Sequence, residues 1–128
     1  METLPENTAV IVIDHGSKRE AANTMLFDVI EQYKAVTGVK VVAAAHMELA
    51  EPTLEDAVKF CLSQEVNRIV VHPYFLAPGR HSTGDIPAMV AEMATAYPEV
   101  TFHVSEPLGV APELAEIMQR RILDALGA

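Results

Sequence analysis

The chain has 128 residues, a formal net charge of -9 and nine Lys and Arg residues in total. So few basic residues argue against a nucleic-acid partner, because phosphate contacts need clustered Lys and Arg, and the charge argues equally against an anionic membrane surface. The single cysteine, Cys61, excludes a disulfide framework and a cysteine-held zinc or iron-sulfur site within one chain. With no apolar run near the ~20 residues of a membrane span and no amino-terminal signal pattern, we expect a cytoplasmic protein.

Strand-like and helix-like segments alternate along the whole chain. We expect strands at residues 8–14, 39–45, 68–71 and 100–104, and helices at residues 18–36, 53–63, 86–97 and from 112 onward. The first and third strands have no polar side chain in their centres, which is typical of strands buried on both faces of a parallel sheet. This alternation predicts an α/β fold, a four-stranded parallel sheet with helices on both faces, and a single domain covering residues 1–128.

Local signals predict how the helices begin and what they bury. Ser17 and Glu20 have the spacing of a capping box for the first helix, and Pro52 fits the first turn of the second. Four methionines fall on helix stripes and are expected to fill the core: Met25, Met89, Met93 and Met118. The last helix has apolar residues at helical spacing: Leu114, Ile117, Met118, Ile122 and Leu126.

Histidines follow the expected strands where each gives way to a loop. His15 comes after Asp14 and before Gly16, which permits a sharp turn, and His72 closes the third strand. Because loops beyond the carboxyl ends of parallel strands form the ligand crevice, we expect His15, His72 and His81 to share one edge. This edge is the candidate site, with His15 as a metal ligand or a base.

The long loop at residues 78–85 places His81 beside Arg80. A neutral imidazole at His81 could bind a divalent metal, and Arg80 could hold a carboxylate. The alternative is a solvated loop in which Asp85 only caps the next helix.

The segment after the second strand adds two carboxylates to the same edge. Glu48 is the better candidate for metal binding or proton transfer, while Glu51 can be an ordinary first-turn carboxylate. His46 and His72 are either ligands or supporting core histidines, and His103, inside the fourth strand, is expected to be structural.

Three ordered motifs resemble one family, the small class II chelatases of the CbiX and SirB type. They are Asp14-His15-Gly16-Ser17, the segment at residues 47–52, and Pro73-Tyr74-Phe75-Leu76 continuing through Gly79, His81 and Asp85-Ile86-Pro87. Members insert cobalt, iron or nickel into sirohydrochlorin or a close relative. The resemblance covers nearly the whole chain and implies a chelatase-like half-unit that forms a homodimer, because two-domain members carry two facing halves.

The resemblance also implies roles for individual residues. The two metal-handling histidines of the family match His15 and His81, and Glu48 matches the carboxylate that assists them. Ser17 and Arg80 are expected to bind the tetrapyrrole. Lys18, Arg19 and the amino terminus of the first helix are further anchors for its carboxylates. No cofactor is expected to be permanently bound, and Co²⁺, Fe²⁺ or Ni²⁺ is a substrate, for cobalamin or siroheme synthesis.

Two other functions are compatible with the same residues. A metal or tetrapyrrole carrier would use this site to bind and release without turnover. A histidine-dependent phosphohydrolase also has an apolar strand that ends in His-Gly, but Asp14 stands here where such enzymes have an arginine.

Overall fold

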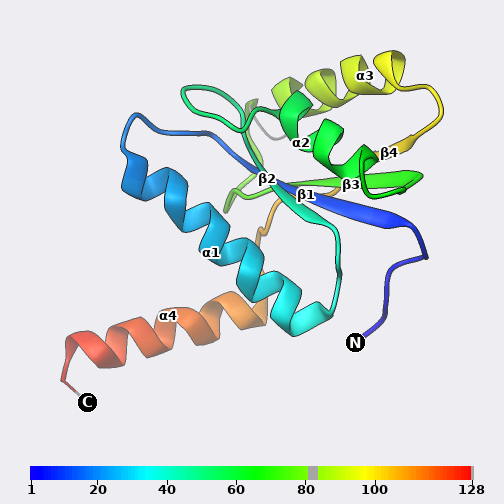
Figure 1. Ribbon diagram of the computed structural model, residues 1–128. Helices are drawn as coiled ribbons and strands as arrows, with labels where there is room; N and C mark the ends of the chain where they lie inside the picture. The colour runs from blue at the N-terminus through cyan, green and yellow to red at the C-terminus, as the bar shows by residue number, and fades with distance from the viewer. Residues whose placement is uncertain (81–83, 128) are drawn as a thin grey trace.

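The computed structural model describes residues 1–80 and 84–127. In these residues strands and helices alternate along the chain (Figure 1). The strands are β1 (Thr8–Asp14), β2 (Val42–His46), β3 (Arg68–Pro73) and β4 (Thr101–Val104). The helices are α1 (Glu20–Thr37), α2 (Leu54–Leu62), α3 (Ile86–Ala96) and α4 (Pro112–Ala125). None of these helices is long and apolar enough to cross a membrane.

The strands form one parallel sheet in the order β2-β1-β3-β4, as expected from their apolar sequences. In the register, Asp14 at the end of β1 pairs with His46 at the end of β2. The same register aligns Ile13 with Pro73 at the end of β3. The carboxyl ends of β1, β2 and β3 therefore reach the same edge of the sheet, and the loops that follow them lie together.

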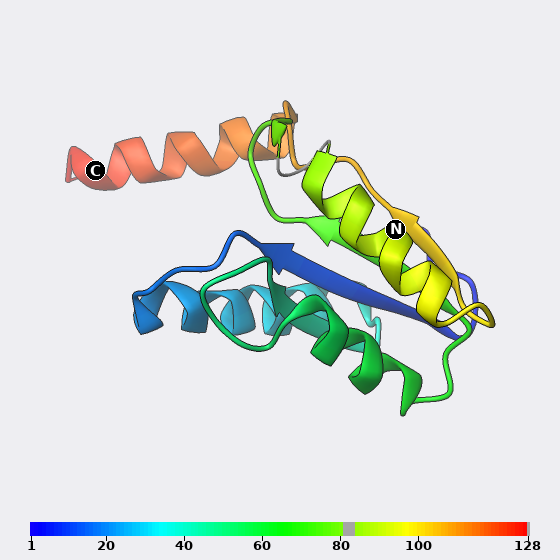
Figure 2. The same cartoon turned by 90° about the horizontal axis from the view of Figure 1, so that it is seen from above.

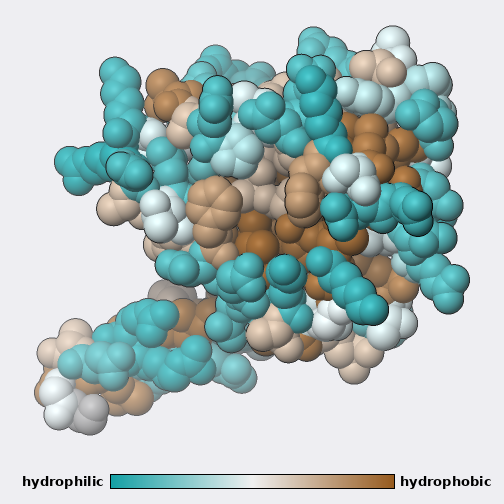
Figure 3. All heavy atoms as spheres, in the orientation of Figure 1, coloured by the Kyte–Doolittle hydropathy of each residue, from teal (hydrophilic) through white to brown (hydrophobic). Residues whose placement is uncertain are grey.

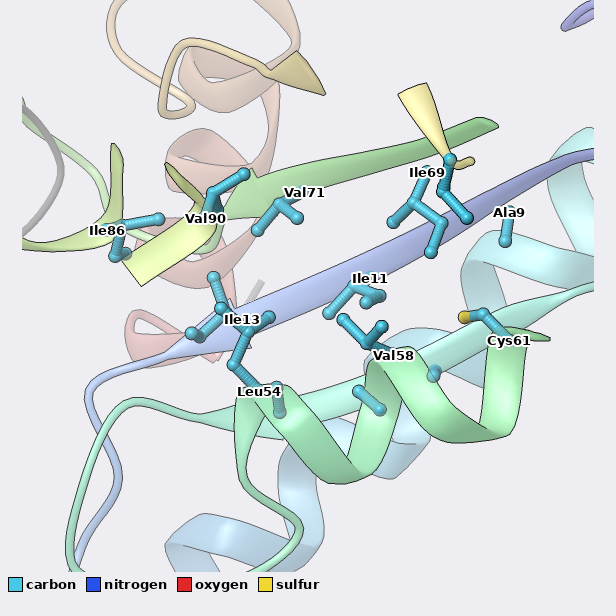
Figure 4. Close-up of a cluster of buried hydrophobic side chains, with 14 residues drawn as sticks. Ala9, Ile11, Ile13, Leu54, Val58, Cys61, Ile69, Val71, Ile86 and Val90 are labelled. Carbon is cyan, nitrogen blue, oxygen red and sulfur yellow. The ribbon is translucent and has the colours of Figure 1, made fainter. Parts of the chain in front are cut away.

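The main core lies between the sheet and the layer formed by α2 and α3 (Figure 4). Ile11 and Ile13 of β1 and Ile69 and Val71 of β3 are completely buried on this face. Cys61 of α2 is also fully buried, as the sequence predicts, and burial raises the pKa of its thiol to about 12. Each large side chain buried here contributes roughly 1.5–3 kcal/mol to folding, so this face supplies most of the rigidity on which the strand-end loops depend.

The opposite face has a smaller core beneath α1. Val10 and Val12 of β1 and the β2 residues beside them pack against Leu26 and Ile30. α1 thus covers the β2 and β1 half of this face.

Helix α4 does not pack on the sheet, which corrects the expectation that all the helices cover its two faces. It has no buried residue and extends away from the sheet in both views (Figures 1 and 2). Met118 on α4 is accordingly 62% exposed, and Met25 on α1 is 56% exposed, so neither fills the core as expected. Met89 and Met93 of α3 do pack against it.

The starts of three helices differ from the sequence-based expectation. The expected capping box of Ser17 and Glu20 is absent, because α1 begins at Glu20 and Arg19, not Ser17, is its N-cap residue. The Ser17 hydroxyl instead accepts a hydrogen bond from the Arg19 amide at 3.0 Å. Thr53 instead forms a capping box with Asp56 on α2, so Pro52 precedes the helix and does not lie in its first turn. Asp85 makes no side-chain cap on α3.

Candidate active site

The loops after β1 and β2 continue the pairing of the two strands. The Met47 amide donates to the Asp14 carbonyl oxygen at 2.8 Å, and the Glu48 amide donates to the His15 carbonyl oxygen at 3.1 Å. This backbone pairing holds His15 and Glu48 side by side just beyond the sheet. The two residues that were predicted from separate motifs are therefore neighbours.

Gly16 permits this close approach of the two loops. Its φ of +90° lies in the left-handed region, which is strained for residues other than glycine. A Cβ at Gly16 would lie 1.9 Å from the carbonyl oxygen of Glu48. The glycine is required both for the turn and for the space that Glu48 occupies, as its place after His15 suggests.

The side chains of His15 and Glu48 are in direct contact. His15 Nε2 lies 3.0 Å from Glu48 Oε1, with the two side chains 39% and 53% exposed. The other ring nitrogen of His15, Nδ1, lies 3.2 Å from the Gly16 carbonyl oxygen. A neutral imidazole carries one N–H, so it can donate to only one of these two oxygens, and the lone pair of its other nitrogen then faces an acceptor.

A divalent cation suits this arrangement. Imidazole nitrogen and carboxylate oxygen are ligands of borderline divalent metals, with bonds of about 2.1 Å. Two such bonds that meet at a right angle place their donor atoms ~3 Å apart, as in octahedral coordination. The separation of His15 Nε2 and Glu48 Oε1 therefore matches two adjacent positions of one coordination shell.

The other predicted site residues lie in the loops after β1 and β3 or outside the described part of the chain. His81 belongs to residues 81–83, which fall outside the described residues. Among residues 1–80 and 84–127, no group of three or more His, Cys, Asp or Glu side chains is arranged to hold a metal ion. Lys18, Arg19 and Arg80 are exposed, and Ser17 is half-buried with its amide bonded to the Asn23 side chain.

A second histidine–carboxylate pair lies directly beneath the first. His46 Nδ1 lies 2.6 Å from Asp14 Oδ1, and His46 is completely buried. Its Nε2 has no hydrogen-bond partner in the described structure. His46 therefore supports the strand ends and cannot reach a ligand in solution. The aligned strand-end positions of Asp14 and His46 are the signal in the sequence that could have identified this pair.

The remaining histidines lie on β3 and β4. His72 is half-buried, with Nδ1 2.8 Å from Ser105 Oγ, and burial lowers its pKa. His103 lies within β4, as expected, and is exposed there. Neither residue contacts His15 or Glu48 through any interaction found in the described residues.

Two large apolar side chains are exposed in the strand-end loops and escaped the sequence interpretation. Leu49 follows Glu48 and is 55% exposed, and Leu76, in the loop after β3, is 70% exposed. The sequence signal that could have marked both is a large apolar residue in a segment expected to be a loop after a strand. Both leucines leave apolar surface exposed in the loops after the strands.

Two cavities lie away from this pair. One, of about 580 Å³, is lined by residues 1–8 and by residues around the end of α1. The other, of about 410 Å³, lies over β2 between α1 and α2. The His15 and Glu48 pair lines neither of them.

Comparisons with known proteins agree with this geometry. The CbiX family model matches residues 9–125. Sirohydrochlorin ferrochelatase from Arabidopsis thaliana is 40% identical over 117 residues, which cover 91% of this chain and 52% of the plant protein. Sirohydrochlorin cobaltochelatase from Methanopyrus kandleri is 31% identical over 139 residues, covering 93% of this chain and 97% of that protein. The chain thus spans about half of the plant relative and nearly all of the archaeal one.

Solved structures share the fold. SirB from Bacillus subtilis with Fe³⁺ superimposes with a TM-score of 0.85 and 30% identity, covering 92% of this chain and 47% of SirB. SirB from subspecies spizizenii in complex with cobalt has a TM-score of 0.85 and 29% identity, covering 91% of this chain and 50% of that one. From the family match, these identities and the shared fold, the chain belongs to the CbiX family.

Proposed function

We propose that this protein is a sirohydrochlorin chelatase, which inserts Co²⁺ or Fe²⁺ into the tetrapyrrole. The single observation that carries the proposal is the 3.0 Å contact between His15 Nε2 and Glu48 Oε1, half-exposed at the carboxyl ends of the strands. The names of the plant and archaeal relatives support both the substrate and the choice of metals.

The donor set fits a metal that must be handed over. His15 and Glu48 supply two ligands, and His81, from the loop before α3, is the third that we propose. Such an incomplete shell leaves positions open for the nitrogens of the macrocycle, whereas a closed tetrahedral site would retain the ion.

Insertion of the metal releases two pyrrole protons, which need an acceptor close to the macrocycle. Glu48 is a half-exposed carboxylate beside His15 and is the acceptor that we propose. The Glu48 amide donates a hydrogen bond to the His15 carbonyl oxygen, which holds the backbone of Glu48 in place. The carboxylate therefore stays next to the imidazole as the ion leaves.

Both basic side chains and apolar side chains would contribute to binding of the tetrapyrrole. Its carboxylates would meet Arg80, Lys18 and Arg19, which are exposed at this edge, while Ser17 contributes a hydroxyl near the start of α1. A local group of cations acts over a Debye length of ~8 Å, so it can attract an anion despite the net charge of -9. Leu49 and Leu76 would contact the flat ring.

We further propose that two copies of the chain face each other over the macrocycle. The plant relative is about twice as long as the segment matched here, while the archaeal relative is matched over 97% of its length. A homodimer would supply in two chains what the longer relatives hold in one.

Anaerobic absorbance spectroscopy of sirohydrochlorin with Co²⁺ or Fe²⁺ tests the proposal. We expect metallation above the spontaneous rate, and a fall on the order of 100-fold in His15→Ala, His81→Ala and Glu48→Gln. Glu92→Gln is the matched control, because Glu92 is exposed on α3 and lies outside the site. Competition among Co²⁺, Fe²⁺ and Ni²⁺, read by mass spectrometry of the product, identifies the preferred metal.

The outcomes separate the chelatase from a carrier. Metallation at the parent rate by His15→Ala and His81→Ala would contradict the proposal. Stoichiometric binding of metal or tetrapyrrole, without turnover of excess substrate, would instead assign a carrier role to the same residues.

A further inference from the structure

Leu49, in the loop after β2, combines two unfavourable features. Its backbone φ is +70°, in the left-handed region where a Cβ is crowded by the backbone, and its side chain is 55% exposed. Among residues 1–80 and 84–127, the other non-glycine residues with a positive φ are Asn7 and Glu65, and both are polar. Leu49 is therefore the one large apolar residue of the described chain that is held in this conformation.

Contacts at both ends of the loop impose this turn. The Glu48 carbonyl, which forms the peptide bond to Leu49, lies so close to Gly16 that a Cβ on the glycine would be 1.9 Å from its oxygen. At the other end, the His46 amide donates to the Pro52 carbonyl oxygen at 2.8 Å, so the chain must turn back between these contacts. Glycine or asparagine makes such a turn with less strain, yet this chain has a leucine there.

Packing inside the protein does not explain the choice of leucine. Met47, two residues earlier, packs against the main core, whereas Leu49 is not among the residues of either core. Phe27 and Phe60 are also about half-exposed, but they line the cavity over β2, where hydrophobic atoms gather between α1 and α2 (Figure 3). Leu49 lines neither of the two cavities. Folding alone therefore gives no reason for an exposed and strained leucine at this position.

We propose that Leu49 is a tetrapyrrole-binding residue, held in its strained conformation so that its side chain packs on the face of the macrocycle beside Glu48. Backbone strain that packing does not offset is typical of ligand sites, where the surroundings fix an unfavourable conformation. Leu76, although 70% exposed, has no positive φ, so this argument distinguishes Leu49 from the other exposed leucine of the strand-end loops.

The position of Leu49 in the chain brings it within reach of the ring. Its Cα lies about 3.8 Å from that of Glu48, the proposed acceptor of the pyrrole protons. A ring close enough to give protons to Glu48 therefore passes within reach of the Leu49 side chain. This inference rests on the proposed function, because it takes the tetrapyrrole as the ligand.

The contact should act on the macrocycle and not on the metal. A leucine side chain has no donor atom for a cation, and the Glu48 backbone is held by its own hydrogen bond to the His15 carbonyl oxygen. Removal of the Leu49 side chain should therefore weaken tetrapyrrole binding and leave the affinity for Co²⁺ unchanged.

Leu49→Gly removes the side chain and the strain together. In an anaerobic absorbance titration with sirohydrochlorin, without metal, we expect its Kd to be about tenfold higher than that of the parent, as for the loss of one apolar contact. In the metallation assay KM should rise by a similar factor with kcat nearly unchanged, because bound substrate and transition state share the contact. Leu49→Phe keeps a large apolar side chain and should bind like the parent.

Glu65→Gly is the matched control. Glu65 has a φ of +61° and is exposed between α2 and β3, at the opposite edge of the sheet. Because glycine relieves the strain at both positions, neither Leu49→Gly nor Glu65→Gly should have a lower urea midpoint than the parent. Only Leu49→Gly should bind sirohydrochlorin more weakly.

Three results would overturn the inference while the proposed function stands. They are equal sirohydrochlorin affinity of Leu49→Gly and the parent, a lower urea midpoint of Leu49→Gly, which would show that the side chain stabilises the fold, and a parallel loss of Co²⁺ affinity in titration calorimetry, which would show that Leu49 acts through Glu48. A parent chain that binds no sirohydrochlorin would contradict the proposed function and this inference with it.

Discussion

The two histidine–carboxylate pairs at the strand ends are adjacent in sequence and opposite in environment. Asp14 and His46 meet at 2.6 Å, with the histidine fully buried, whereas His15 and Glu48 meet at 3.0 Å with both side chains half-exposed. Each pair joins the end of β1 to the end of β2 or to the loop that follows it. The same chemical groups thus serve two purposes at positions one and two residues apart.

Burial decides between these purposes. A hydrogen bond removed from solvent is costly to leave unmade, so the Asp14 and His46 pair holds the strand ends together. An exposed pair contributes little to folding because water competes for both partners, which leaves His15 and Glu48 available for a ligand. Substitutions in each pair should therefore separate stability from activity.

The largest expected effect on stability follows removal of Asp14. Asp14→Ala leaves the buried imidazole of His46 without its partner, and we expect the free energy of unfolding to fall by about 2–3 kcal/mol, measured by urea denaturation. Asp14→Asn keeps an oxygen acceptor and should lose less. If Asp14→Ala and the parent had equal urea midpoints, the buried pair would have no structural role.

An intermediate effect is expected at Gly16. Gly16→Ala combines a positive φ with a Cβ 1.9 Å from the Glu48 carbonyl oxygen, so the loops must separate. Gly38→Ala is a matched control, because Gly38 has a φ of +76° but no atom within 4 Å of the added Cβ. Gly38→Ala should cost about 1 kcal/mol and Gly16→Ala clearly more, with metallation impaired only in Gly16→Ala. Equal losses in the two variants would show that the close approach to Glu48 is unimportant.

The smallest effect on stability is expected at the exposed pair. His15→Ala and Glu48→Gln should change the free energy of unfolding by less than about 1 kcal/mol, since half-exposed ion pairs contribute little. Metal binding, followed by titration calorimetry with Co²⁺, should nevertheless weaken strongly in both. A loss of stability as large as that of Asp14→Ala would mean that the outer pair is structural too.

Much of the fold could be predicted because short apolar runs in the sequence mark the strands of the sheet. Runs such as Ile11 to Ile13 and Ile69 to Val71 are apolar on both faces, which is typical of parallel sheets. The first run is buried on both faces, whereas Val70 in the second is only half-buried. The candidate site followed from one further rule, that loops after parallel strands share an edge. That rule placed His15 and Glu48 together before any distance was known.

The errors came from residues whose local signal competes with tertiary contacts. Ser17 and Glu20 have capping-box spacing, but the Asn23 side chain bonds the backbone of Ser17 and the helix begins later. The spacing of Ile117 and Ile122 predicts an amphipathic helix correctly, yet says nothing about the surface it covers. Local patterns define an element and the face that it must bury. Which surface packs on that face depends on contacts with residues far apart in the sequence.

The sequence by itself determined the alternation of elements, the parallel sheet and the edge at which His15, Gly16 and Glu48 lie, because these follow from short-range patterns of apolar and polar residues. Only the tertiary structure decided that His46 is buried against Asp14, that Leu49 and Leu76 are exposed in the strand-end loops, and that α4 does not pack on its own sheet. Those features depend on distances between segments far apart in the chain, which no local pattern encodes.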